Sequence, residues 1–188
     1  MNKIIIFLFI LIITGCSGML PSVKQTTKSP WKTFEGAKLS FDKIEANKTT
    51  SEDLKKLGFD PFETPNVKLV TYLELIERFM PNQSIRLEDL DIGVQQCLKV
   101  RDLCQGYEIS PKIINSKRYG NVFMDLFNFR RKKITRGWIF DALIVLKEGL
   151  VVHKVWGGEP NVSRIEDKKN PLGPLQDINK ALPPIKLM

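Results

Sequence analysis

Three cysteines and one histidine are the side chains in this sequence best suited to redox chemistry or to binding a transition metal. Cys97 and Cys104 lie seven positions apart, which is not the C-x-x-C spacing typical of redox or zinc pairs. On one continuous helix, that separation spans about 10.5 Å along the axis, whereas a disulfide needs Cα atoms about 5.5 Å apart. We therefore predict a structural disulfide, which requires that the helix expected over residues 87–100 ends between the two cysteines. A catalytic or metal-binding pair is the alternative.

His153 is the only histidine and lies between apolar residues of the run 150–156. This placement favours a sheet residue with a local hydrogen bond over a catalytic group. Glu88, Asp89 and Asp91 are interpreted as the solvated start of a helix, where acidic residues are favourable. The sequence contains no nucleophile elbow, no phosphate-binding glycine loop and no metal-ligand cluster. We expect no catalytic residue, no cofactor and no metal, and so predict that the protein is not an enzyme.

The third cysteine, Cys16, follows a short apolar run. Lys3 precedes residues 4–13, which are all Ile, Phe or Leu. Ten residues of helix reach only about 15 Å, roughly half the hydrocarbon thickness of a bilayer, so the layout is that of a signal peptide and not of a membrane span. The run ends in Ile13-Thr14-Gly15-Cys16, which resembles the lipobox of bacterial lipoproteins. This resemblance implies cleavage before Cys16 and attachment of diacylglycerol and a fatty acid such as palmitate to that cysteine.

Lipid on Cys16 would set the location of the protein. Three acyl chains on one cysteine make attachment effectively permanent, because each buried methylene contributes about 0.8 kcal/mol. Ser17 is not acidic, which in enteric bacteria favours the outer membrane, facing the periplasm. We therefore expect a lipid-anchored protein of the cell envelope.

The net charge of +8 permits attraction to anionic headgroups, acidic proteins or nucleic acid. Removal of residues 1–15 takes away only Lys3 and leaves +7. Export argues against nucleic acid as the partner. The basic residues are dispersed along the sequence except for residues 130–133, which we interpret as a solvated turn or strand end.

The chain divides into four predicted segments: a signal peptide (1–15), a lipidated flexible tether (16–30), an α+β domain (31–160) and a proline-containing tail (161–188). The tail could dock on a sheet edge or remain loosely attached, and the sequence favours neither. Within the domain we predict a helix over 47–58, capped by Thr49 or Thr50, and a strand over 67–72. Residues 72–79 could continue that strand or begin a helix.

Later strands are predicted over 120–130, 137–147 and 150–156, forming an antiparallel meander. Glu148 and Gly149 make the hairpin turn between the last two. In the middle strand both faces carry apolar residues, so we expect the sheet to be covered on both sides. Of the three tryptophans, at least two are expected in the core. The predicted fold class is α+β, a two-layer domain with N-terminal helices packed on the meander.

Residues 44–61 contain the pattern KTTxxDLxxLGxDP and resemble the opening helix of the SmpA/OmlA (BamE-like) small outer-membrane lipoproteins. The lipobox upstream and the predicted meander over 123–156 agree with the layout of that family. The resemblance implies an ααβββ layout and an accessory role in the β-barrel assembly machine. The chain departs from that family by an insertion over residues 63–118, which contains the cysteine pair. No binding residue of the family carries over to this sequence.

These observations lead to three functional hypotheses. The first is a non-enzymatic envelope lipoprotein that binds other envelope proteins, in outer-membrane protein assembly or envelope integrity. The second is a periplasmic module that binds a small ligand or inhibits a hydrolase, because a two-layer α+β domain with a concave sheet can seat a loop or an apolar molecule. The third is an envelope enzyme whose residues meet only in space.

Overall fold

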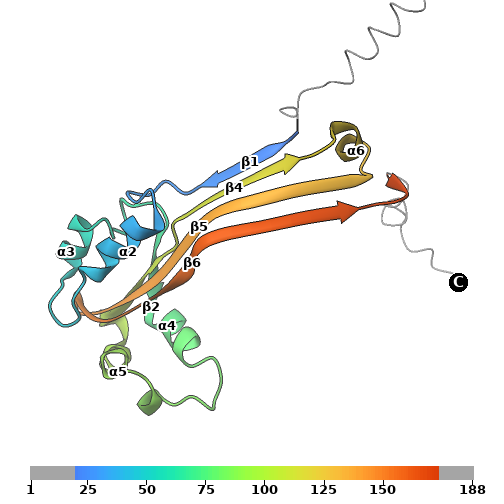
Figure 1. Cartoon of the computed structure of the whole chain (residues 1–188). Helices are drawn as coiled ribbons and strands as arrows, with labels where there is room; N and C mark the ends of the chain where they lie inside the picture. Colours follow the sequence, from blue (N-terminus) through green and yellow to red (C-terminus); the bar gives the residue numbers. More distant parts are fainter. Residues whose placement is uncertain (1–19, 174–188) are drawn as a thin grey trace, which may run out of the picture. The chain divides into compact units, whose positions relative to one another are not determined.

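The computed structural model describes residues 20–173, whose helices and strands are drawn in Figure 1. These residues divide into two compact units. Within that range, unit 1 comprises residues 20–24, Asn115–Arg136 and 163–173, and unit 2 comprises Gln25–Ile114 and Gly137–Val162. Four strands contribute residues to both units, namely β1 (Ser22–Thr26), β4 (Lys112–Tyr119), β5 (Arg130–Lys147) and β6 (Leu150–Lys169). The predicted signal peptide, Cys16 and the part of the predicted tail beyond residue 173 lie outside the described residues.

A six-stranded, mostly antiparallel sheet organises the part of the chain that the structure describes. The strand order is β1-β4-β5-β3-β2, and β6 pairs with β5 off this path. The other two strands are β2 (Val67–Thr71) and β3 (Cys104–Ile109). The helices are α2 (Phe34–Asp42), α3 (Ser51–Lys56), α4 (Tyr72–Phe79), α5 (Ile92–Lys99) and α6 (Val122–Leu126), with 3-10 helices at Leu87–Asp89 and Arg101–Leu103.

The predicted two-layer arrangement of N-terminal helices on a meander is wrong. The structure is dominated by strands, above all by the long hairpin of β5 and β6. In unit 2 the helices also divide between the two faces of the sheet. Phe41 of α2 and Leu54 of α3 belong to one buried cluster, whereas Leu75 of α4 and Val94 of α5 belong to another.

The sequence of β5 gives the physical reason for this division. Even-numbered residues of its second half, Phe140 to Leu146, enter the first cluster, and Val145 and Leu143 enter the second. A strand that is apolar on both faces needs cover on both. The segment interpreted as an insertion supplies the second cover, because it contains α4 and α5. The prediction that both faces are covered is confirmed.

Several local predictions are confirmed. Thr50 caps α3 by accepting from the Asp53 amide, and the Asp53 carboxylate accepts from the Thr50 amide in return. Glu148 and Gly149 both have positive φ, 52° and 79°, which is the backbone that a tight hairpin turn requires. The undecided segment 72–79 is helical, because Thr71 and Glu74 form a second capping box.

The predicted strand over 120–130 is wrong, because Val122–Leu126 forms α6. Asn121 caps this helix by accepting from the Met124 amide, and Asn128 ends the turn with φ 58°. An asparagine at each end defines a short helical turn more strongly than the aromatic residues favour a strand. Strand β1 lies within the segment assigned to the tether, and β6 continues to Lys169, within the segment assigned to the tail.

Candidate functional site

The predicted disulfide between Cys97 and Cys104 is confirmed. The two Cα atoms are 4.9 Å apart, and both side chains are buried in unit 2. Helix α5 ends at Lys99, and the 3-10 turn that follows brings Cys104 back to the start of β3. The bond therefore fastens the end of α5 to the central sheet.

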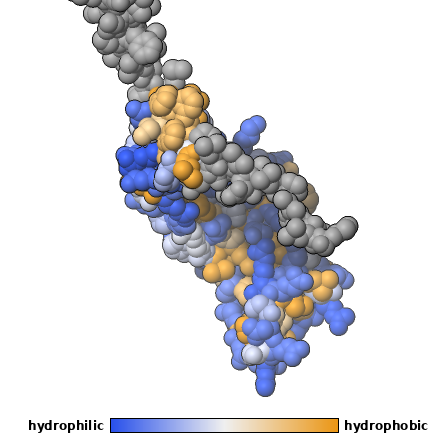
Figure 2. Space-filling model, turned by 90° about the vertical axis from the view of Figure 1, so that its right-hand side faces the viewer, coloured by the Kyte–Doolittle hydropathy of each residue, from blue (hydrophilic) through white to orange (hydrophobic). Residues whose placement is uncertain are grey.

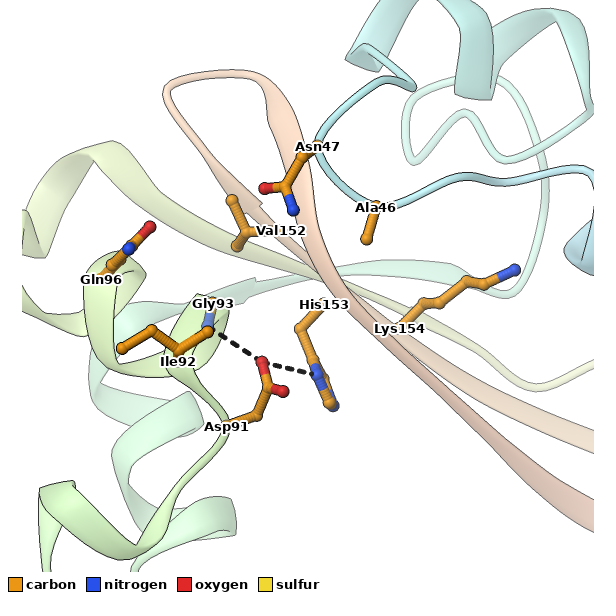
Figure 3. A pocket seen from close by; sticks show the side chains of 9 residues that line it. All are labelled: Ala46, Asn47, Asp91, Ile92, Gly93, Gln96, Val152, His153 and Lys154. Atoms are coloured by element: carbon orange, nitrogen blue, oxygen red, sulfur yellow. Dashed lines mark hydrogen bonds and ion pairs between the residues drawn. The ribbon is translucent and has the colours of Figure 1, made fainter.

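The start of α5 is fastened to the sheet by an Asp–His pair (Figure 3). His153 of β6 lies with its Nδ1 3.2 Å from the Oδ1 atom of Asp91. That same Oδ1 accepts a hydrogen bond from the Gly93 amide at 2.9 Å, so Asp91 is also the N-cap of α5. The other flank of the imidazole meets Phe79 edge to face, with ring centroids 6.0 Å apart. The ring is thus held between a carboxylate and an aromatic face.

Gly93 allows this close approach of helix to strand. A Cβ atom at this position would lie 2.2 Å from the carbonyl oxygen of Val152. This oxygen belongs to the backbone of β6, so it cannot move aside as a flexible side chain could. Only glycine lets the first turn of α5 pack this near to β6. The position of Asp91 opposite His153 therefore depends on Gly93.

A pocket of about 390 Å³ opens beside this pair in unit 2. Its lining comes from the loop before α3, from the start of α5 and from β6 (Figure 3). The lining residues are Ala46, Asn47, Asp91, Ile92, Gly93, Gln96, Val152, His153 and Lys154. They include no hydroxyl and no thiol side chain.

Lys154 belongs to the pocket lining, but its ammonium group is directed to backbone oxygen. Its Nζ donates to the carbonyl oxygen of Phe41 at 3.1 Å and lies 4.8 Å from the centroid of the Phe41 ring. Partial burial disfavours the charged form and lowers the pKa of Lys154 from its ordinary value. This lysine ties β6 to the end of α2.

Trp156 forms a second notable site on β6. Its ring lies parallel to that of Phe140, at an interplanar angle of 7° and a centroid distance of 6.2 Å, and it meets Phe34 edge to face. The Lys38 ammonium lies 4.7 Å from the centroid of the Trp156 ring. Although 44% of Trp156 is exposed, three neighbours therefore restrict its ring.

The structure places the residues selected from sequence as follows. His153 is a strand residue, as predicted, but its partner Asp91 comes from a distant part of the sequence and not from a local hydrogen bond. Asp91, which the sequence indicated as the solvated start of a helix, both caps α5 and pairs with His153. Their pairing was missed because the two residues are far apart in sequence and the signal, one histidine and one N-cap acid, is weak. Trp31 is buried and Trp138 is partly buried against the same core, whereas Trp156 is exposed.

Residues 20–173 contain neither a metal-ligand cluster nor a membrane-spanning helix. No group of three or more His, Cys, Asp or Glu side chains is placed there to hold a metal ion. No helix in that range is long and apolar enough to cross a membrane.

The chain matches no family model, no characterised protein and no solved structure. The resemblance to SmpA/OmlA lipoproteins therefore stays a prediction. The layout that it implied is wrong for this chain, because the described residues form a strand-dominated fold with helices on both faces of the sheet in unit 2.

Proposed function

We propose that the protein is a lipoprotein of the bacterial envelope that is held to the outer membrane through Cys16 and acts by binding another envelope protein, without catalysis. The lipobox residues Ile13 to Cys16 support the anchor. The disulfide between Cys97 and Cys104 supports export, because such bonds form and persist in oxidising compartments.

The observation that carries the binding role is the exposed and restrained ring of Trp156. Tryptophan is enriched among the residues that dominate protein interfaces, because it offers a large apolar area with few rotatable bonds. Stacking on Phe140 and the contact with Lys38 fix the ring before any partner arrives. A fixed ring loses little conformational entropy on binding, which favours affinity.

The strand that carries Trp156 adds a second element of recognition. In residues 20–173, β6 pairs with β5 alone, so its other edge bears no further strand. Thr49 covers the beginning of this edge by accepting from the Val151 amide, and Val155 to Asn161 are all exposed. Pro160 limits strand addition there because it has no amide hydrogen. We therefore assign the contact to the Trp156 side chain and its neighbours.

The role is tested by photo-cross-linking in living cells. A photoreactive amino acid is placed at position 156 in the tagged full-length protein, and adducts are identified by mass spectrometry. The matched control carries the same amino acid at position 73, because Leu73 is an exposed apolar residue of unit 2 that lies on another element, α4. We expect a discrete adduct with one envelope protein from position 156 and none from position 73.

The anchor is tested in the same strain by metabolic labelling with an alkyne fatty acid. Label on the wild-type protein and none on Cys16→Ala supports lipidation of Cys16. An adduct of equal yield from positions 156 and 73, or none from either, would remove the binding role. Recovery of subunits of the barrel-assembly machine would assign the partner to that machine; a different envelope complex would place the function there.

The pocket beside His153 favours a second candidate, a module that binds a small ligand. Its volume of about 390 Å³ suits a small molecule, and Asp91, His153 and Gln96 offer polar contacts. Native mass spectrometry of the protein purified from its own envelope distinguishes the two candidates. A retained small molecule that is lost in Gln96→Leu would favour the pocket, whereas an empty protein would leave protein binding as the function.

A further inference from the structure

The positive charge of the protein is concentrated in unit 1. In the described residues, unit 1 contains eleven Lys and Arg side chains against three Asp and Glu, whereas unit 2 contains fifteen against seventeen. The net charges are therefore +8 and −2. Since unit 1 is assembled from three separate stretches of sequence, this concentration is not visible along the chain. All three acids of unit 1 already take part in ion pairs, with Arg118, Arg130 and Lys133.

Unit 1 also exposes most of its large apolar side chains. Both buried apolar clusters of the described structure lie in unit 2. Among the described residues of unit 1, Leu20 is the only large apolar residue that is buried. On and beside α6, by contrast, four apolar residues are between 42% and 73% exposed. They are Phe123, Met124, Leu126 and Phe127. Figure 2 shows orange, apolar surface next to blue surface at its upper end, the level at which Figure 1 draws α6.

These apolar residues are held in place by the backbone. The Phe127 amide donates to the Phe123 carbonyl oxygen, and the two rings lie 4.4 Å apart. Behind the helix, Asn170 at the end of β6 donates from its amide to the carbonyl oxygen of Phe129 and from its side chain to that of Asn128. Hydrogen bonds and a ring contact within unit 1 therefore fix the position of this exposed apolar surface.

The proposed lipid attachment point is connected to this surface by a short segment of chain and a few contacts. Cys16 precedes Leu20 by four residues, so the two can be at most about 14 Å apart. The next residue, Pro21, accepts through its carbonyl oxygen from the Arg118 amide, and the Arg118 side chain pairs with Asp125 of α6. A short series of contacts within unit 1 therefore joins the beginning of the described chain to α6.

We propose that α6 and the basic residues of unit 1 dock on the surface of a bilayer that contains anionic lipids. The aromatic and aliphatic side chains of α6 enter the boundary between headgroups and acyl chains, while the surrounding Lys and Arg side chains contact lipid phosphates. Exposed Phe, Leu and Met beside cationic side chains are the composition by which peripheral proteins bind membranes. The inference rests on the proposed anchor at Cys16, which would bring unit 1 to the membrane.

A bilayer fits this surface better than a folded protein does. A protein interface is depleted of charge at its centre, and Lys in particular is rare there. Unit 1 instead combines exposed apolar residues with a net charge of +8 within 38 described residues. Anionic headgroups complement this charge over an extended area, and each Lys or Arg near such a surface attracts it independently.

The test measures whether position 123 reaches the lipid. A fluorescent amino acid sensitive to its surroundings replaces Phe123 in the full-length chain, which is purified and mixed with vesicles. The vesicles contain about three parts phosphatidylethanolamine to one part phosphatidylglycerol and carry a lipid with a nitroxide quencher just below the headgroups. The matched control has the same amino acid at position 62, because Phe62 is 81% exposed in unit 2. Vesicles of phosphatidylcholine show whether anionic lipid is needed.

We expect at least fivefold stronger quenching at position 123 than at position 62, and loss of most of that quenching in phosphatidylcholine. Equal quenching at the two positions, or none at position 123, would overturn the docking proposal. The intact mass of the same sample reports acylation of Cys16 separately. Quenching at position 123 in an unacylated chain would support docking and count against the anchor, whereas an acylated chain without quenching would retain the anchor and remove docking.

Discussion

Units 1 and 2 share four strands but differ in where their apolar side chains lie. Unit 2 encloses its apolar residues between a sheet and helices on both faces, fastens α5 by a disulfide and an Asp–His pair, and carries a net charge of −2 in the described residues. Unit 1 buries mainly polar side chains, such as Asp125, Thr135 and Asn170, and exposes its apolar ones. Unit 2 places apolar side chains in its own core, whereas the exposed apolar side chains of unit 1 form the surface that we propose docks on a membrane.

Replacement of one phenylalanine in each unit gives the largest expected contrast. Phe140→Ala removes a ring that is 0% exposed in the core of unit 2, so we expect a loss of about 3 to 5 kcal/mol in the free energy of unfolding. Phe123→Ala truncates a ring that is 62% exposed in unit 1, so we expect a change within about 0.5 kcal/mol. Urea unfolding followed by circular dichroism measures both. A similar loss in the two variants would contradict the contrast.

Reduction of the disulfide should weaken unit 2 alone. The bond between Cys97 and Cys104 closes a short loop, so we expect its loss to cost about 2 to 3 kcal/mol, chiefly through the greater freedom of the unfolded chain. Urea unfolding of Cys97→Ser/Cys104→Ser, compared with the wild type, measures this cost. Quenching at position 123 by vesicle lipid should be unchanged in that variant. A loss of quenching would mean that unit 1 depends on the fixed end of α5.

Removal of two consecutive exposed lysines from either unit tests whether docking on vesicles depends on the charge of unit 1. Lys168→Gln/Lys169→Gln removes two charges from unit 1 and should weaken docking on anionic vesicles by about tenfold or more, because each lysine contributes about 1 kcal/mol there. The control is Lys55→Gln/Lys56→Gln on α3 of unit 2. The measurement is the salt concentration at which quenching at position 123 is half lost. An equal decrease of this salt concentration in both variants would show that docking depends on the total charge of the protein and not on the charge of unit 1.

The smallest expected effect concerns pH and a capping residue of unit 2. A hydrogen bond from Lys68, at 2.7 Å, holds the pKa of Glu74 at about 2, below its ordinary value of 4.5. Because the folded state binds this proton less readily, the stabilisation is complete above pH 4.5 and is lost as the pH falls towards 2. Glu74→Gln should lower the melting temperature slightly at neutral pH and leave it unchanged near pH 2. A decrease of the same size at both pH values would assign the effect to packing.

Much of the local structure of this protein follows from its sequence. Capping residues at Thr50 and the turn at Glu148 and Gly149 act over a few positions, so their effect could be predicted without the fold. The disulfide could be predicted by the same kind of reasoning, because Cys97 can bond to Cys104 only if the helix ends between them. The apolar residues on both faces of β5 likewise predicted a sheet that is covered on both sides.

Only the tertiary structure decided how these elements combine. The sequence did not indicate that α4 and α5 form the second cover, because that depends on the order of strands in the sheet. The pairing of Asp91 with His153 depends on the close approach at Gly93, and the +8 charge of unit 1 depends on three distant segments that meet in space. Composition and residue spacing predict features formed by neighbours in sequence. The proposed binding surfaces could not be predicted in this way, because the sheet brings together residues that are distant in sequence.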